Sequence, residues 1–102
     1  MLHVIATVTL AEGGLDAWSR AFAAVRPAVL AEDGCIAYEA TVEQPGVLGA
    51  QPPLPPATVV IVERWRDAAA LQAHSTAPHM TEYRAAVKPH VAGVAIHVLR
   101  PL

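Results

Sequence analysis

The hydrophobic and polar positions of this chain change their period several times, and each period predicts one element. Residues 2–10 carry apolar side chains at every second position, which is typical of a strand. From residue 15 onward the apolar positions recur every three or four residues, which predicts an amphipathic helix. The residues on this helix face are Leu15, Trp18, Phe22, Val25 and Val29. Pro27 has no N–H to donate, so we expect a kink or a break there, and Asp33-Gly34 should mark the end of the helix.

Two more strands are predicted in the middle of the chain. Residues 35–43 alternate again, with Ile36, Tyr38, Ala40 and Val42 on one face and charged residues on the other, which suggests an edge or a rim. Residues 57–65 form the most hydrophobic strand, which is apolar on both faces until Glu63. Between these strands, residues 44–56 are rich in proline, glycine and glutamine and should form a surface loop. Such a long loop is either a lid or partner contact, or an inert linker.

The last third of the chain predicts a divided helix and a final strand. Asp67 can cap a short helix that starts at Ala68 and ends near His74 or Ser75. Pro78 interrupts it, and a second helical piece is expected at about residues 79–88. Residues 91–99 are strand-like. The order predicts one α+β domain over residues 1–102, with the ferredoxin-like βαββαβ arrangement of a four-stranded antiparallel sheet covered on one face by helices.

The uncovered face of such a sheet has a consequence for assembly. We expect Leu2, Val4, Ala6 and Val8, together with Val94, Ile96 and Val98, to be apolar on a side opposite their neighbours, and residues 59–62 to be apolar on both sides. A monomer would therefore expose a large apolar patch. The pattern predicts a homodimer in which two sheets pack face to face and close an α+β barrel.

Composition excludes several classes of function. The 102 residues are 54% hydrophobic and 16% charged, with a net charge of -2 and a single lysine, so there is no basic stripe for nucleic acid. No run approaches the roughly 18 apolar residues of a membrane helix. The first residues do not resemble a signal peptide, and we expect a cytoplasmic protein without a membrane partner. The single cysteine, Cys35, is interpreted as a small core residue.

His74 and His79 are the histidines that best fit chemistry. Five positions apart on an unbroken helix they would point about 140° away from each other, which argues against a metal site, so we expect no metal. Acid–base work fits better. His79 would lie near a helix N-terminus, whose field favours the neutral imidazole, while His74 would feel the opposite field. The two could divide the roles of base and acid, or be structural, with His74 capping its helix turn and His79 packing under Trp65.

Other candidate residues lie near these histidines. Glu63 and Trp65 leave the same face of their strand, so Glu63 either forms a structural ion pair or orients a histidine. Tyr83 and Arg84 could supply a phenol donor and an anion-stabilising guanidinium, or be surface residues. No phosphate-binding glycine loop, dinucleotide fingerprint or nucleophile motif is present, so no flavin or nicotinamide is expected.

These segments together resemble the antibiotic biosynthesis monooxygenase family, small dimeric proteins with a ferredoxin-like fold. The segments that carry the resemblance are Glu32-Asp33-Gly34-Cys35, Glu63-Arg64-Trp65, Ala73-His74 and Pro78-His79-Met80. The resemblance is closest to the quinol monooxygenase branch, which implies oxidation of a quinol or polycyclic phenol by O₂ without a metal or organic cofactor. The implied catalytic residues are His79, His74 and Glu63, and the implied substrate-binding residues are Trp65, Tyr83, Arg84 and Thr7.

Two other branches bear on this interpretation. The haem-degrading branch uses an Asn on the first strand and a Trp and a His on the second helix, whereas the comparable positions here are Thr7, His74 and Arg84, so haem oxygenation is discounted. The autoinducer-processing isomerases resemble this chain in the same His-to-Pro-His segment. An isomerase of a small metabolite and a non-catalytic dimeric binding or stress protein therefore stand as alternatives.

Overall fold

The computed structural model describes all 102 residues. The strands are β1 (Leu2–Leu10), β2 (Cys35–Thr41), β3 (Thr58–Trp65) and β4 (Val91–Leu99), and the helices are α1 (Leu15–Leu30), α2 (Ala68–Thr76) and α3 (Pro78–Val87), with a short 3₁₀ turn η1 (Lys88–His90) before β4. The predicted order is confirmed, including the division of the second helix at Pro78. None of the helices has the length and apolar character needed to cross a bilayer.

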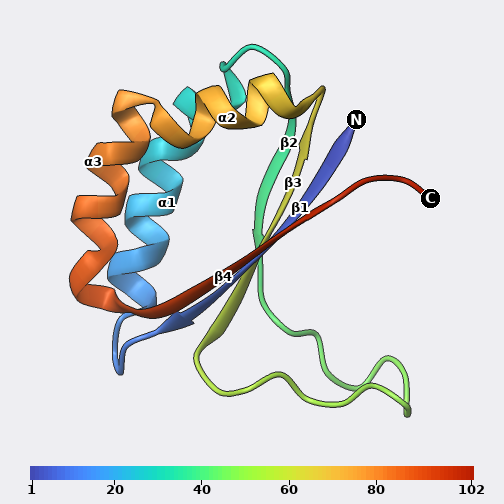
Figure 1. Cartoon of the computed structure of the whole chain (residues 1–102). Coiled ribbons are helices and arrows are strands. Elements are labelled where there is room, and N and C mark those ends of the chain that lie inside the picture. The colour runs from blue at the N-terminus through green and yellow to red at the C-terminus, as the bar shows by residue number, and fades with distance from the viewer.

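The four strands form one antiparallel sheet in the order β2-β3-β1-β4, so β1 and β3 are central. The predicted antiparallel sheet and the edge position of β2 are therefore confirmed. Figure 1 shows α1 and α3 side by side on one face of the sheet, with α2 leading from β3 into α3. This α+β arrangement is the ferredoxin-like fold expected from the pattern.

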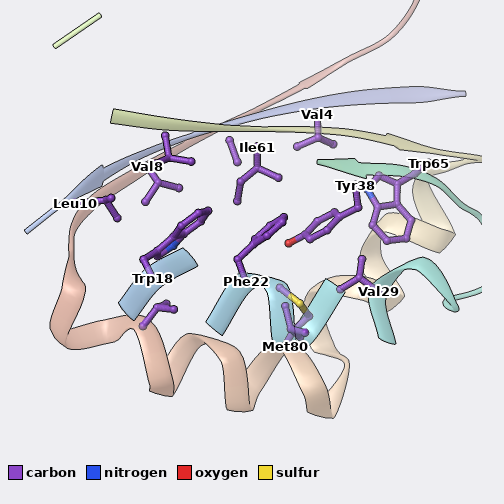
Figure 2. Packing of buried hydrophobic residues seen from close by; sticks show 14 of the residues in the cluster. Val4, Val8, Leu10, Trp18, Phe22, Val29, Tyr38, Ile61, Trp65 and Met80 are labelled. Carbon is purple, nitrogen blue, oxygen red and sulfur yellow. The ribbon is translucent and has the colours of Figure 1, made fainter. Parts of the chain in front are cut away.

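The core lies between the helices and the face of the sheet that they cover. Alternate residues of the two central strands are buried there: Val4, Ala6, Val8 and Leu10 from β1, and Val59, Ile61, Glu63 and Trp65 from β3. The helix face predicted from the 3.6-residue period supplies Trp18, Phe22, Val25 and Val29, all of them buried. Figure 2 shows the rings of Trp18, Phe22 and Tyr38 in a row between α1 and the strands. Adjacent ring centroids in this row are 5.1 and 5.3 Å apart.

The expected apolar patch is placed differently from the prediction. Val4, Ala6 and Val8 lie under the helices and are nearly inaccessible, so they do not belong to a free face. In the antiparallel register Val98, Ile96 and Val94 of β4 stand opposite these three residues and therefore share their face. They are nevertheless 51, 63 and 56% exposed, because β4 is an edge strand that the helices do not cover. The other face of the sheet carries half-buried residues, among them Ile5, Thr7, Val60 and Val62.

Three local predictions need correction or adjustment. The helix α1 continues through Pro27 to Leu30 without a break. Pro27 and Ala23 are both exposed, so water can satisfy the carbonyl that loses its partner. Ile36 does not share the buried face of Tyr38, because an irregularity between Cys35 and Ala37 shifts the register and leaves Ile36 47% exposed. The strand β2 also ends at Thr41, two residues earlier than predicted.

The predicted surface loop is confirmed and occupies residues 42–57. It extends beyond the sheet on the side away from the helices (Figure 1). The Leu54 backbone N–H donates a 2.6 Å hydrogen bond to the Glu43 carboxylate, which ties the end of the loop to its start. Val47 and Leu48 in this loop are apolar and largely exposed, at 67 and 70%.

Phe22 is a sharp test of the packing described above, because its ring lies between Trp18 and Tyr38 in the aromatic row. The substitution Phe22→Ala should lower the free energy of unfolding by about 3–5 kcal/mol, measured by urea denaturation. Leu15→Ala, at the exposed start of the same helix, should cost less than about 1 kcal/mol. Equal losses for the two variants would contradict this assignment of the core.

Candidate functional site

A cavity of about 640 Å³ opens between the helix-facing side of the sheet and the helices α2 and α3. Fourteen of its 19 lining residues are hydrophobic. The sheet side includes Ala6 and Ile61, and the uncovered edge strand contributes Val94, Ile96 and Val98. The cavity exists because the helices cover the central strands and leave β4 uncovered. Its volume and apolar walls suit an aromatic molecule of a few rings.

The break between α2 and α3 brings the two candidate histidines together. The Asp67 carboxylate caps α2 by accepting the Ala70 N–H at 2.9 Å, and His74 lies in the last turn of that helix. Ala77 then adopts an extended conformation, and α3 begins with Pro78 at its first position, where a missing N–H costs nothing. His79 is the next residue. The change of direction at Ala77 removes the divergence that a continuous helix would impose on the two rings.

Both histidines bond to the same oxygen of Glu32, which lies in the turn after α1. His74 Nδ1 is 2.9 Å and His79 Nε2 is 2.8 Å from Glu32 Oε2. The Glu32 and His74 side chains are 12 and 8% exposed, whereas that of His79 is 29% exposed. No group of three His, Cys, Asp or Glu side chains is arranged to hold a metal ion. The contacts are hydrogen bonds to a carboxylate that the sequence analysis did not single out.

The turn that carries Glu32 can approach α2 because of a glycine. Gly34 has φ +85°, and a Cβ at this position would lie 2.5 Å from the Ala70 Cβ. Only glycine therefore fits both the backbone conformation and the close approach to α2. The Arg66 backbone N–H donates to the Gly34 carbonyl at 2.8 Å, and the Arg66 guanidinium pairs with Asp33 at 3.0 Å on the surface. These contacts bring Glu32 within reach of the end of α2.

His74 is buried among aromatic rings. Its ring centroid is 4.6 Å from that of Trp65 and 5.4 Å from that of Tyr38, which meets it edge-on. His74 lines the cavity, and its Nε2 is the ring nitrogen that Glu32 does not engage. Trp18 Nε1 is the only fully buried side-chain nitrogen or oxygen without a hydrogen-bond partner, so His74 Nε2, which also has no partner, is not fully buried. A neutral His74 can therefore accept a proton from a molecule held there.

Glu63 has a hydrogen-bond partner that neither of the two sequence interpretations named. Its Oε1 accepts the Trp65 indole N–H at 2.9 Å, so Glu63 anchors the Trp65 ring and makes no direct hydrogen bond to a histidine. The carboxyl group lines the cavity and is 5% exposed. Burial raises the pKa of the Glu63 carboxyl above its ordinary value of 4.5, an effect that the Trp65 N–H and the nearby His74 oppose and that Glu32 reinforces.

Two phenols and a guanidinium are further polar groups of the cavity wall. Burial raises the pKa of Tyr83 to about 12 and moves the pKa of Tyr38 upward even further, so both hydroxyls keep their protons at neutral pH and can donate them in hydrogen bonds. Arg84 lines the cavity from the exposed side of α3. Its guanidinium donates to the Ser75 carbonyl at 2.8 Å, which holds it near the end of α2.

The structure brings most of the predicted site residues together. His74, Glu63, Tyr83 and Arg84 line the cavity, and Trp65 lies behind His74. His79 does not line it and faces a separate groove between α1 and α3. The predicted packing of His79 under Trp65 is wrong, since His74 is the histidine that packs on Trp65.

Thr7 does not line the cavity. It pairs with Val60 and Ala95 on the opposite face of the sheet, while its neighbours Ala6 and Val8 face the helices.

Glu32 and Tyr38 were missed as site residues. The two histidines follow Glu32 by 42 and 47 residues, so no local spacing could have linked them.

Comparison with known proteins gives a consistent result. The model of the family "Antibiotic biosynthesis monooxygenase" matches residues 1–86. The probable quinol monooxygenase YgiN of Escherichia coli (strain K12) is 38% identical over 80 residues, which are 78% of this chain and 76% of that protein. Two solved structures have a TM-score of 0.80: Rv0793 from Mycobacterium tuberculosis, 30% identical with 99 and 94% of the two chains covered, and PA3566 from Pseudomonas aeruginosa, 28% identical with 99 and 93% covered.

The buried carboxyl of Glu63 should make stability depend on pH. Because its pKa is raised in the folded state, the native protein binds this proton more tightly than the unfolded chain does. The contribution of Glu63 to stability is therefore present below pH 4.5 and is lost as pH rises through the folded-state pKa. Glu63→Gln keeps an acceptor for Trp65 and removes the ionisation. Urea denaturation at a series of pH values should show that the free energy of unfolding of Glu63→Gln rises relative to that of the wild type as pH rises. A difference between the two free energies that does not change with pH would contradict the assignment.

Proposed function

This chain belongs to the antibiotic biosynthesis monooxygenase family, and on that premise we propose that it oxidises a quinol or polycyclic phenol to a quinone with O₂, using neither a metal nor an organic cofactor. The observation that carries the proposal is the apolar cavity of about 640 Å³ with a single free imidazole nitrogen, that of His74, in its wall. The similarity to a probable quinol monooxygenase supports the substrate class.

The first step is removal of a phenolic proton. An aromatic substrate lies against the apolar walls, and His74 Nε2 takes the proton of one ring hydroxyl as general base. The imidazolium that forms is stabilised by Glu32, whose Oε2 is 2.9 Å from His74 Nδ1. The base is therefore His74, and the Glu32 carboxylate bonds to its other ring nitrogen. Other acid–base pairs also combine an imidazole with a carboxylate in this way. The sequence had favoured His79 for this role.

The second step is reaction of the phenolate with O₂. Loss of the proton makes the ring electron-rich, and the cavity holds O₂, itself apolar, beside it. The ring supplies the electrons: a ring carbon that bears hydrogen forms a bond to one oxygen atom and becomes a hydroperoxide. Cleavage of the O–O bond with loss of that hydrogen gives a carbonyl, and the second oxygen atom leaves as water with the two hydrogens released by the substrate. His74 returns its proton to the peroxide oxygen, so a phenol and O₂ give a quinone and water. A quinol such as menadiol, whose ring also has a carbon that bears hydrogen, gives a hydroxyquinone and water by the same step.

The remaining polar groups assist the developing charges. The Tyr38 and Tyr83 hydroxyls keep their protons and can donate hydrogen bonds to substrate oxygen atoms. Arg84 places a positive charge at the rim of the cavity, where it favours the anionic phenolate and hydroperoxide. Glu63 holds the Trp65 ring against His74 and so limits the movement of the base.

A homodimer fits this proposal. The face of the sheet away from the helices has apolar residues such as Ile5, Val60 and Val62 at its centre, and the long loop of residues 42–57 extends on the same side (Figure 1). Packing of two such faces would bury apolar surface that a monomer leaves in water. The loop would then lie alongside the partner subunit.

Oxygen consumption tests the proposed reaction. The wild type should take up O₂ with menadiol faster than menadiol autoxidises. His74→Asn keeps an N–H near the position of Nδ1 but removes Nε2, and kcat should fall by about 100-fold or more because the general base is lost.

His90→Asn, a change in η1 at a histidine that does not line the cavity, is the matched control and should behave like the wild type. If uptake is unaffected by changes at His74, His79 and Glu63, the reaction does not occur at this site. The protein would then be better described as a dimeric binding protein.

The assembly is tested by placing a charge on the free face of the sheet. Val62, which stands opposite Ile5, should not tolerate glutamate in a face-to-face dimer, and Val62→Glu should sediment as a monomer while the wild type sediments as a dimer. Ala85→Glu adds the same charge to an exposed position of α3 and should leave the dimer intact. A dimeric Val62→Glu, or a monomeric wild type, would contradict the arrangement.

A further inference from the structure

We infer that Glu32 and His79 form a clamp that holds His74 in one tautomer, with the proton on Nδ1 and the lone pair of Nε2 directed at the cavity. In this arrangement His79 is a positioning residue and does not exchange protons with the substrate. The inference rests on the proposed function, because it concerns how the base of that reaction is prepared.

The tautomer follows from the chemistry of the shared acceptor. An ionised carboxylate oxygen accepts hydrogen bonds and donates none, so each nitrogen that contacts it must carry a hydrogen. The two contacts to Glu32 Oε2, at 2.9 and 2.8 Å, therefore place a proton on His74 Nδ1 and another on His79 Nε2. Neutral His74 then has its lone pair on Nε2. The other tautomer would point a lone pair at the carboxylate and present an N–H, which cannot accept a proton, to the substrate.

The position of His79 explains why its role is to hold Glu32. Its ring lies in the groove between α1 and α3 and contributes nothing to the wall of the cavity. The nitrogen that it directs inward, Nε2, is already bonded to Glu32. The effect of this bond is to occupy the second acceptor direction of Oε2, so that the carboxylate cannot rotate away from His74 or be taken by water. Glu32 sits in a short turn and has no other hydrogen-bonding partner among the side chains of the chain.

The three residues of the clamp are far apart in the sequence and belong to three different elements. Glu32 comes from the turn after α1, His74 from the end of α2, and His79 from the start of α3. The close approach of the turn to α2 depends on Gly34, as described above. The clamp therefore connects the base to the packing of all three helices, which keeps Nε2 at a constant position relative to the sheet wall of the cavity.

A matched pair of variants separates the clamp from a catalytic role for His79. His79→Gln places an amide N–H near the position of the histidine Nε2 and should keep kcat within about twofold of the wild type, because the bond to Glu32 survives. His79→Ala and Glu32→Gln should lower kcat by roughly 10–100-fold with KM little changed, by analogy with the losses found when the hydrogen-bond partner of a metal-ligating histidine is removed. A loss in His79→Gln as large as that in His79→Ala would overturn the inference.

The tautomer of His74 can be measured by NMR in the absence of substrate. Two-dimensional ¹⁵N–¹H spectra of the histidine rings, recorded at alkaline pH and assigned with His74→Asn, should show His74 protonated on Nδ1 in the wild type and in His79→Gln. Glu32→Gln and His79→Ala should show a shift toward protonation on Nε2. A wild-type His74 protonated on Nε2 would overturn the clamp whatever the activity. A clamp seen in the spectra of a protein that takes up no O₂ would support the clamp and count against the proposed reaction.

Discussion

Incomplete coverage of one face of the sheet is the constraint on which the rest of the structure depends. The helices cover β3 and β1 and leave the edge strand β4 open, so Val4 is 2% exposed while its partner Val98 on β4 is 51% exposed. The uncovered part of the face becomes the floor and wall of the cavity. The same apolar alternation that builds the core under α1 thus continues along β4 as the wall of the cavity.

The chemistry of the site depends on the break between α2 and α3. A continuous helix would have separated His74 and His79, and the extended conformation of Ala77 followed by Pro78 brings both rings onto Glu32. The Glu32 carboxylate, with only 12% of its side chain exposed, needs hydrogen-bond donors, and two imidazole N–H groups satisfy one of its oxygens. The arrangement stabilises positive charge on His74 while leaving its other nitrogen free, which is what a general base in an apolar cavity requires.

The two carboxyl groups near His74, those of Glu32 and Glu63, have different roles because their hydrogen-bond partners differ. Glu32 accepts hydrogen bonds from imidazoles and is partly open to solvent, whereas Glu63 accepts the Trp65 indole and is buried against the sheet. Burial raises the pKa of Glu63, so its ionisation weakens the fold that holds the site. Groups whose pKa is shifted by burial at the wall of a cavity cluster at functional sites.

Periodicity alone determined the order of the strands and the buried face of α1, because these depend on which side of a local element faces the core. Proline and glycine signals located the break at Pro78 and a loop at residues 44–56, which the structure extends to 42–57. Only the tertiary structure decided that Val4, Ala6 and Val8 lie under helices, that Thr7 faces the other way, and that His74 rather than His79 reaches the cavity. These outcomes depend on strand order and on contacts between residues more than 40 positions apart, such as Glu32 with His74 and His79. No local pattern encodes them, since the partner of a buried polar group is chosen by packing and not by its neighbours in the chain.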